Sequence, residues 1–243
     1  MSDHRPSCQP IQDQGNCGSC TAFGITGIAE LRAFLKYGTP IKLSEKDLFF
    51  CSGGKCAQGN TMDAAFARAM RGIPVYECCP YEDKDALCGQ DRCEEWWSNA
   101  IKVLDPELII DDTEIDIEID GGGIVGTMAV YESFTYLVGD DVYTGPTGIF
   151  DPLLGYHCIG IVGRTGDGAD ILRNSWATDW GNEGYCKITR KCSGLEYWRL
   201  DISNEVEPDD GPEPDDGLPV NPLILAIIVI VIIIAIFLQY LAA

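Results

Sequence analysis

Basic side chains are scarce in this 243-residue sequence, which contains 17 Lys and Arg against 38 Asp and Glu, and only two His. The net charge of -21 argues against a nucleic-acid partner, because the dominant attraction to phosphate groups would be reversed. The first ten residues, MSDHRPSCQP, also lack the apolar stretch of a secretory signal. We therefore expect no nucleic-acid partner, and no targeting signal is visible at the N-terminus.

Cysteine is abundant instead, with twelve residues that all lie between Cys8 and Cys192. This usage is unusual for a cytosolic protein and indicates disulfide bonds in an oxidising compartment, lumenal or extracellular. Such a location requires a route across a membrane. Either the sequence is a mature form that has lost a leader, or its C-terminal end alone targets the protein.

The C-terminal end carries a long apolar run. No polar residue occurs from Pro222 to Leu238, and we interpret residues 218–241 as a single-pass transmembrane helix in the lipid bilayer. A cleaved lipid-anchor signal is the alternative, because small residues and a polar spacer precede the run. Residues 203–217 are rich in Pro, Gly, Asp and Glu and lack aromatic residues, which predicts an extended acidic stalk.

Two cysteines in the stretch QDQGNCGSCTAF, Cys17 and Cys20, are separated by two residues. This spacing suits a metal knuckle, a redox pair, or a disulfide cysteine beside a nucleophile. Structural zinc needs a second such pair, and no other cysteine pair in the sequence repeats the spacing. A thioredoxin-like redox pair needs a preceding hydrophobic strand, whereas the segment before Cys17 is polar. We therefore expect no metal and no cofactor.

The segment after Cys20 favours the nucleophile. TAFGITGIAELRAFLKYG is crowded with apolar residues, as expected of a buried helix, and ends at Gly38 with Pro40 beyond it. Cys20 then lies on the first turn of this helix. The helix dipole and the unpaired N–H groups there favour a thiolate.

A cysteine nucleophile also needs a base. A histidine partner can lower a cysteine pKa from about 8.5 to roughly 3–4. His157 precedes the strand-like stretch IGIVGR, and Asn174 follows in an Asn-Ser-Trp turn. An amide oxygen that accepts a hydrogen bond from the imidazole would fix its orientation, as the third group of a nucleophile–base–orienter set does.

Together these residues resemble the papain family of cysteine proteases. The family signature is a Cys-Gly-(Ser/Ala)-Cys run with His and Asn about 130–150 residues downstream. Here His157 and Asn174 follow Cys20 at 137 and 154 residues. LSEKDLFFC and ECCPYEDKDALC resemble further family segments, and MAVYESFTYLVGDDVYTGPTGIF is closest to the cathepsin B and cathepsin C branches.

The resemblance implies a two-lobed α+β fold over residues 1–202, with a C-terminal transmembrane helix beyond it. A helical lobe would cover about 12–110 and a β-barrel-like lobe about 111–202, with the active cleft between them. The alternation in TEIDIEI mimics a half-exposed strand, whereas the resemblance implies a helix there. We follow the resemblance.

It also implies a function, which is endopeptidase hydrolysis of peptides or proteins by a membrane-anchored monomer. Cys20 would attack the scissile carbonyl, and His157 would protonate the leaving amine and then activate water. The side chain of Gln14 and the backbone N–H of Cys20 would stabilise the oxyanion, and Trp176 would shield the histidine–asparagine contact. Further implied substrate contacts are Gln58, Gly59 and Tyr197.

Disulfide bonds Cys17–Cys56 and Cys51–Cys88 are likewise implied by the resemblance. A bond between Cys186 and Cys192 is a guess from their spacing across a short turn.

Two departures from the family pattern support a different hypothesis. Thr21 replaces the aromatic residue expected after the nucleophile, and KCAQGN replaces the Cys-Asn-Gly-Gly run, so that Gln58 stands where a glycine is expected. The alternative function is therefore a catalytically weak or inactive papain-fold binding module at a membrane surface.

Overall fold

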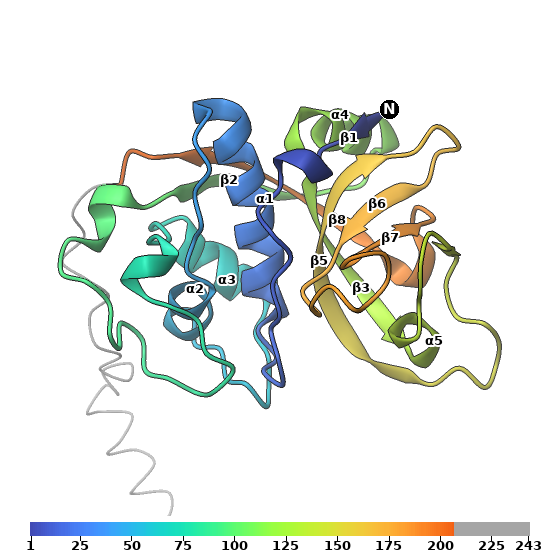
Figure 1. The fold of residues 1–243 in the computed structure, drawn as a ribbon, viewed down its shortest axis with the longest axis horizontal. Helices are drawn as coiled ribbons and strands as arrows, with labels where there is room; N and C mark the ends of the chain where they lie inside the picture. Colours follow the sequence, from blue (N-terminus) through green and yellow to red (C-terminus); the bar gives the residue numbers. More distant parts are fainter. Residues whose placement is uncertain (207–243) are drawn as a thin grey trace, which may run out of the picture. The chain divides into compact units, whose positions relative to one another are not determined.

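The computed structural model describes residues 1–206. In this part, helices gather in one lobe and an eight-stranded sheet builds most of the other, which confirms the predicted α+β class (Figure 1). No helix within the described residues is long and apolar enough to cross a membrane. The predicted transmembrane segment 218–241 and most of the predicted stalk lie outside the described residues.

The helical lobe is built around α1 (Cys20–Tyr37), against which α2 (Glu45–Cys51) and α3 (Met62–Ala69) pack. Helix α1 is buried over most of its length and ends at Gly38, whose φ of 75° suits glycine and whose N–H donates to the Phe34 carbonyl. The two shorter helices begin at side-chain caps, which satisfy N–H groups of the first turn. This packing holds the first turn of α1 in place.

The sheet has the strand order β2-β8-β3-β5-β6-β7-β4, with β1 paired to β5, and is antiparallel except between β4 and β7. Its strands are β1 (Ser2–Asp3), β2 (Lys102–Ile109), β3 (Ile124–Tyr131), β4 (Val142–Tyr143), β5 (Leu153–Arg164), β6 (Asp170–Arg173), β7 (Tyr185–Ile188) and β8 (Glu196–Ser203). Short 3-10 turns occur at Arg5–Ser7, Tyr76–Cys78, Trp96–Asn99 and Cys192–Gly194.

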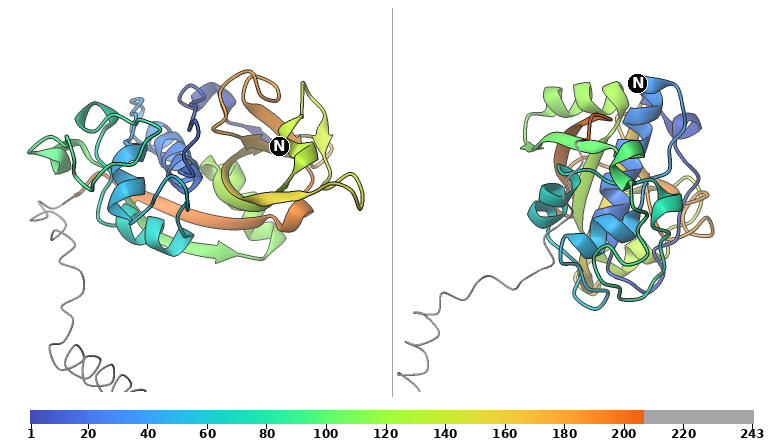
Figure 2. Two further views of the ribbon diagram at one scale, coloured as in Figure 1. Left: turned by 90° about the horizontal axis from the view of Figure 1, so that it is seen from below. Right: turned by 90° about the vertical axis from the view of Figure 1, so that its left-hand side faces the viewer.

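Strands β2 and β8 run along both lobes (Figure 2). Val103, Leu200 and Ile202 from these strands belong to the same hydrophobic core as α1. Strand β2 begins at Lys102 and pairs with β8 in the sheet, so these two strands contribute to both the sheet and the core around α1. The N-terminal strand β1 also joins the sheet, where it pairs with β5.

The segment that reads as an alternating strand forms helix α4 (Asp112–Gly122), as the resemblance implied. Asp111 caps this helix by accepting hydrogen bonds from the N–H groups of Thr113 and Glu114. Ile115 and Ile119, four residues apart, are buried on one face, whereas Ile117 is exposed. The buried face of the helix therefore includes Ile115 and Ile119 but not Ile117, although all three alternate with polar residues in the sequence.

Three disulfide bonds are present, all in the helical lobe or its loops. Cys17–Cys56 and Cys51–Cys88 are the pairs that the resemblance implied, and Cys78–Cys93 was not predicted. The guessed Cys186–Cys192 bond is wrong, because both thiols are free.

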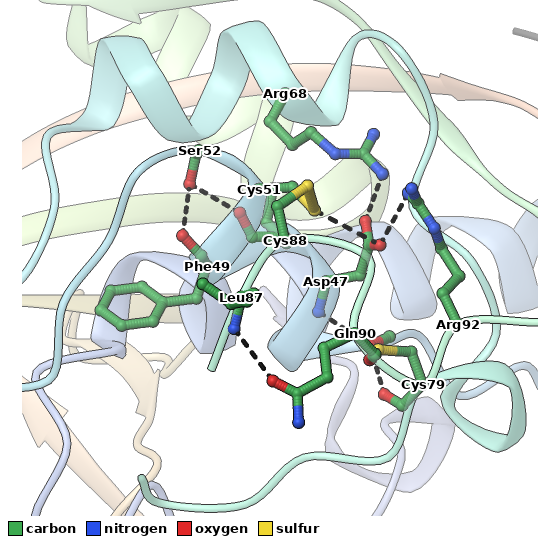
Figure 3. The surroundings of a disulfide bond; sticks show 12 residues. Asp47, Phe49, Cys51, Ser52, Arg68, Cys79, Leu87, Cys88, Gln90 and Arg92 are labelled. Atoms are coloured by element: carbon green, nitrogen blue, oxygen red, sulfur yellow. Dashed lines mark hydrogen bonds and ion pairs between the residues drawn. A yellow bond between two sulfur atoms is a disulfide. The ribbon is translucent and has the colours of Figure 1, made fainter. Parts of the chain in front are cut away.

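The Cys51–Cys88 bond lies beside a buried ionic cluster (Figure 3). The carboxylate of Asp47 is fully buried between the guanidinium groups of Arg68 and Arg92, and its contact with Arg92 is 3.0 Å. A buried carboxylate needs such partners because its desolvation is costly. The cluster ties α2 to α3 and to the loop that carries Cys88.

Candidate active site

Cys20 is the first residue of α1 and lies half-buried as a free thiol. Burial raises the pKa of Cys20, whereas backbone hydrogen bonds from Cys158, Thr21 and Cys20 itself lower it. The positive end of the helix dipole acts in the same direction as these hydrogen bonds. Hydrogen-bond donors that would stabilise a Cys20 thiolate are therefore in place. A thiolate there also needs a positive charge nearby.

His157 lies on β5, opposite Met128 of β3, and its imidazole is almost fully buried. Its Nε2 atom is 2.7 Å from Oδ1 of Asn174. That oxygen also accepts a hydrogen bond of 2.8 Å from the backbone N–H of Ser175, so it faces His157 as an acceptor. In the neutral imidazole the proton is therefore on Nε2, which leaves the Nδ1 lone pair free to take a proton.

Trp176 covers this pair. Its ring is stacked on the imidazole with a centroid distance of 4.6 Å and an interplanar angle of 28°. Burial lowers the pKa of His157 to about 4, although the hydrogen bond to Asn174 raises it. An imidazolium at this place is therefore unfavourable unless an opposite charge forms beside it.

Gln14 is held with its amide in a fixed orientation. Its Nε2 donates to the Cys17 carbonyl at 2.9 Å, and its Oε1 accepts from the Ser175 hydroxyl at 2.7 Å. Its backbone N–H also donates to the Ser175 carbonyl. An amide NH2 has two donor hydrogens, and the second meets no acceptor within residues 1–206, so it is available to a ligand.

These side chains line one cleft of about 620 Å3 between the lobes. Cys20, Gln14, His157 and Trp176 all contribute to its wall, and the described lining contains no Asp, Glu, Lys or Arg. A cleft with a thiol, an imidazole and a free amide donor together has the parts for nucleophilic acyl transfer.

Gln58 and Gly59 form the wall of the cleft on the helical-lobe side. Gly59 has a φ of 73°, and it lies close to Gly18, where an added Cβ would come within 3.1 Å of the Gly59 backbone. The Cys17–Cys56 bond holds these two backbones together. Gln58, which stands where the family has a glycine, is therefore part of the cleft wall.

The structure does not bring Tyr197 to the cleft. Its ring is buried in the core of the β lobe, and its hydroxyl donates to the buried carboxylate of Asp170 at 2.8 Å. The Asp170 carboxylate in turn contacts Arg190 and Arg164. This network fixes Tyr197 in the core of the β lobe, so the predicted contact between Tyr197 and the substrate is wrong.

Other residues of the site were missed in the sequence. Ser175 bonds both the side chain and the backbone of Gln14, and Tyr81 donates from its hydroxyl to the Gln14 carbonyl at 2.9 Å. Because Ser175 directly follows Asn174, the sequence could have indicated that it lies near the site. Tyr81 is distant in sequence from the other site residues, and no local pattern pointed to it. Leu154 and Tyr156, just before His157, also line the cleft.

Ala177, after the shielding Trp176, adopts a strained conformation with a φ of 60°. A left-handed backbone costs an alanine roughly 1–2 kcal/mol, a cost that glycine avoids. We expect Ala177→Gly to raise the free energy of unfolding by about 1 kcal/mol in urea titrations. The matched change Ala67→Gly, at an exposed position of α3, should lower it by about 0.5–1 kcal/mol. Equal losses from both changes would contradict the strain at Ala177.

Comparison with known sequences supports one family. A family model described as papain family cysteine protease matches residues 1–203. The chain is 34% identical over 194 residues to digestive cysteine proteinase 2 of Homarus americanus, which covers 74% of this chain and 58% of that protein. It is also 34% identical over 189 residues to cathepsin L of Sarcophaga peregrina, covering 74% and 55%. The chain thus spans a little over half the length of these relatives.

Several relatives carry cathepsin L names, so the resemblance to the cathepsin B and cathepsin C branches is not confirmed. Among solved structures, the bromelain protease of Ananas comosus in complex with the E64 inhibitor matches with a TM-score of 0.67 at 21% identity, over 82% of this chain and 98% of that one. A cysteine protease of Carica candamarcensis matches with a TM-score of 0.68 at 23% identity, over 82% and 96%. At this identity the structures show a shared fold.

Proposed function

Because the chain belongs to the papain family of cysteine proteases, we propose that it is a membrane-anchored endopeptidase that hydrolyses peptide bonds through Cys20, His157 and Asn174. The observation that carries this proposal is the orientation of His157. Its Nε2–H is bonded to Asn174, so its Nδ1 is free to exchange a proton with a thiol in the same cleft.

Acylation begins when the Cys20 proton moves to Nδ1 of His157. The Cys20 sulfur then attacks the scissile carbonyl carbon, and the carbonyl oxygen becomes an oxyanion. The free N–H of Gln14 and the backbone N–H of Cys20 donate to this oxygen. The carbon–nitrogen bond breaks as His157 gives its proton to the leaving amine, which leaves a thioester on Cys20.

Deacylation uses the same groups in the reverse roles. Neutral His157 removes a proton from a water molecule, and the resulting hydroxide attacks the thioester carbonyl. The carbon–sulfur bond breaks and the carboxylic acid leaves, while the proton taken from water stays on His157 beside the Cys20 thiolate. The products are two peptides, and the enzyme is restored.

The two pKa shifts explain why the pair must charge together. Burial raises the pKa of Cys20 and lowers that of His157, so either charge alone is disfavoured. Transfer of the thiol proton to the imidazole creates both charges at once, and their attraction in a buried site offsets the desolvation. Asn174 and Trp176 keep the imidazole oriented for this exchange.

A pH dependence follows for the variant Cys20→Ala, which has no thiolate to compensate His157. The pKa of His157 in the fold, about 4, lies below its ordinary value of 6.5, so the unfolded chain takes up a proton first as the pH falls. The free energy of unfolding should therefore decrease between pH 6.5 and 4, by up to about 3 kcal/mol. Urea titrations across this range measure the decrease.

The double variant Cys20→Ala with His157→Gln is the matched control, because it keeps every other titrating group. The His157 contribution is the difference between the two pH profiles. Parallel profiles would mean that His157 is not buried in its neutral form.

The proposed substrates are peptide segments in extended conformation, bound by a monomer. The cleft has no charged side chain in its described lining, which favours uncharged residues around the scissile bond. Gln58, on the wall where the family has a glycine, is a candidate contact to the substrate backbone or side chains on that side.

The proposed location is a membrane in an oxidising compartment. The three disulfide bonds support an oxidising environment, and the apolar run from Pro222 to Leu238 supports the anchor. Fractionation of cells that produce the full chain tests both parts of the proposal. The activity that hydrolyses a denatured protein substrate and depends on a thiol should be found in the membrane pellet. Activity that stays in the soluble fraction would contradict the anchor.

A further inference from the structure

A group of exposed apolar residues lies next to the cleft, and the catalytic steps leave it without a role. Ile149 and Phe150 are each 92% exposed, and Tyr136 is 72% exposed. All three line a hollow of about 390 Å3. Single exposed apolar residues are ordinary, whereas a group that lines one hollow marks an interaction site.

Hydrogen bonds fix the walls of this hollow. The Asp151 carboxylate accepts from the backbone N–H groups of Ser133 at 3.0 Å and Thr147 at 2.9 Å. The backbone N–H of Glu132 donates to the Pro152 carbonyl at 3.0 Å. The turn that carries Ile149 and Phe150 is therefore tied to helix α5 (Glu132–Thr135), at the end of the β lobe away from α4 (Figure 1).

The hollow and the cleft adjoin across α5. Thr135 lines the cleft, whereas Ser133 and Tyr136 line the hollow. Leu154 and Tyr156, which also line the cleft, are 57% and 82% exposed and continue the apolar surface. A helix of four residues is about 6 Å long, so an extended peptide that leaves the cleft reaches the hollow within a few residues.

We call this surface the apolar shelf and define it as Tyr136, Ile149, Phe150, Leu154 and Tyr156. Its surroundings are acidic. Residues 131–163, the segment that carries the shelf, contain four Asp and Glu and no Lys or Arg. Two of these acids, Glu132 and Asp151, line the hollow itself. An apolar surface with an acidic rim is complementary to a segment that combines a large apolar side chain with basic neighbours.

We propose that the apolar shelf binds a second segment of the protein substrate, in which a large apolar residue is flanked by Lys or Arg. This inference rests on the proposed peptidase function and adds a substrate class to it. The apolar residue occupies the hollow beside Ile149 and Phe150, and the basic residues lie near the acidic rim. Binding there raises the local concentration of the scissile bond at Cys20, so its effect falls on KM.

The test compares three fluorogenic peptides that share one scissile sequence. The first fills only the cleft, the second adds Lys-Phe-Lys through a short Gly-Ser spacer, and the third adds Glu-Ser-Glu through the same spacer. Each extension is made on the amino side and on the carboxyl side. The full chain should cleave the Lys-Phe-Lys peptide of one series with a KM about tenfold lower than that of the Glu-Ser-Glu peptide, at similar kcat.

The double variant Ile149→Ser with Phe150→Ser removes the exposed side chains and leaves the catalytic residues untouched. It should lose the tenfold preference and cleave the short peptide as the unaltered chain does. The matched control is Ile110→Ser with Ile117→Ser, which removes one exposed apolar side chain just before α4 and one on α4. That control should keep the preference.

The outcomes separate this inference from the proposed function. Cleavage of all peptides without a preference, or a preference that the double variant retains, overturns the shelf as a docking surface and leaves the peptidase in place. No cleavage of any peptide by a folded chain overturns both. A preference lost in the double variant and kept in the control supports the docking surface.

Discussion

Replacement of Cys20 by alanine is expected to abolish peptide hydrolysis, with a loss in kcat of at least about 10^4-fold. The methyl group cannot form the thioester, and no other thiol in the described lining of the cleft replaces it. Because Cys20 makes no disulfide bond, the fold should be retained. Hydrolysis of a fluorogenic peptide by the purified full chain measures the loss, and urea titration near neutral pH checks the fold.

Cys192→Ala is the matched control for this change. Cys192 is also a free, half-buried thiol, but it lies near Tyr143 and is not among the described residues that line the cleft. This variant should hydrolyse the peptide at the rate of the unaltered chain. Activity that survives in Cys20→Ala would mean that a different nucleophile acts, and the proposed mechanism would be wrong.

Replacement of Gln14 by alanine is expected to lower kcat by about 10^2 to 10^3-fold, equivalent to about 2.7–4 kcal/mol of barrier. The free amide hydrogen of Gln14 donates to the oxyanion only after the carbonyl carbon becomes tetrahedral, so KM should change little. The variant also removes the hydrogen bonds to Cys17 and Ser175, and some loss of stability should accompany it. Steady-state kinetics separates the two effects.

Gln58→Ala provides the comparison, since it removes the same side chain from another wall of the same cleft. We expect this change to act on KM rather than on kcat. If Gln58→Ala lowered kcat as much as Gln14→Ala does, the assignment of Gln14 as the oxyanion donor would be contradicted.

The parts of the site that local chemistry determines could be predicted from the sequence. Cys20 follows a glycine-rich turn and precedes a long apolar stretch, so its place at a helix start could be read directly. His157, Asn174 and Gln14 came from the family resemblance, and the structure places His157 and Gln14 in the wall of one cleft, with Asn174 hydrogen-bonded to His157. The same resemblance implied the Cys17–Cys56 and Cys51–Cys88 bonds.

The rest depended on contacts between distant segments. Whether Tyr197 faces the cleft or the core depends on the face of β8 to which it belongs, and the sequence does not give that face. In the structure, its hydrogen bond to Asp170 fixes it in the core. Cys186 and Cys192 are close in sequence yet unpaired, whereas Cys78 and Cys93 are bonded. Sequence spacing says how long a loop is, but not where two thiols point.

The alternation at α4 shows a related limit. Ile115, Ile117 and Ile119 follow one another at the period of a strand, and the helix buries only the first and the last. The capping carboxylate of Asp111 and the acidic first turn favour a helix, but these signals are weaker than the alternation. The packing of α4 on β5 and β3 decides between the two structures.

The most direct test of the central claim is covalent labelling of the full chain with a peptidyl epoxide at about pH 5.5, where an unactivated thiol with a pKa of about 8.5 is almost entirely protonated. Mass spectrometry locates the modified cysteine, with the urea-denatured chain as the control. An activated nucleophile in an open cleft predicts a single adduct on Cys20 that requires the fold. A folded chain that forms no adduct, or forms adducts on its free thiols alike, would contradict that claim and favour a papain-fold binding module.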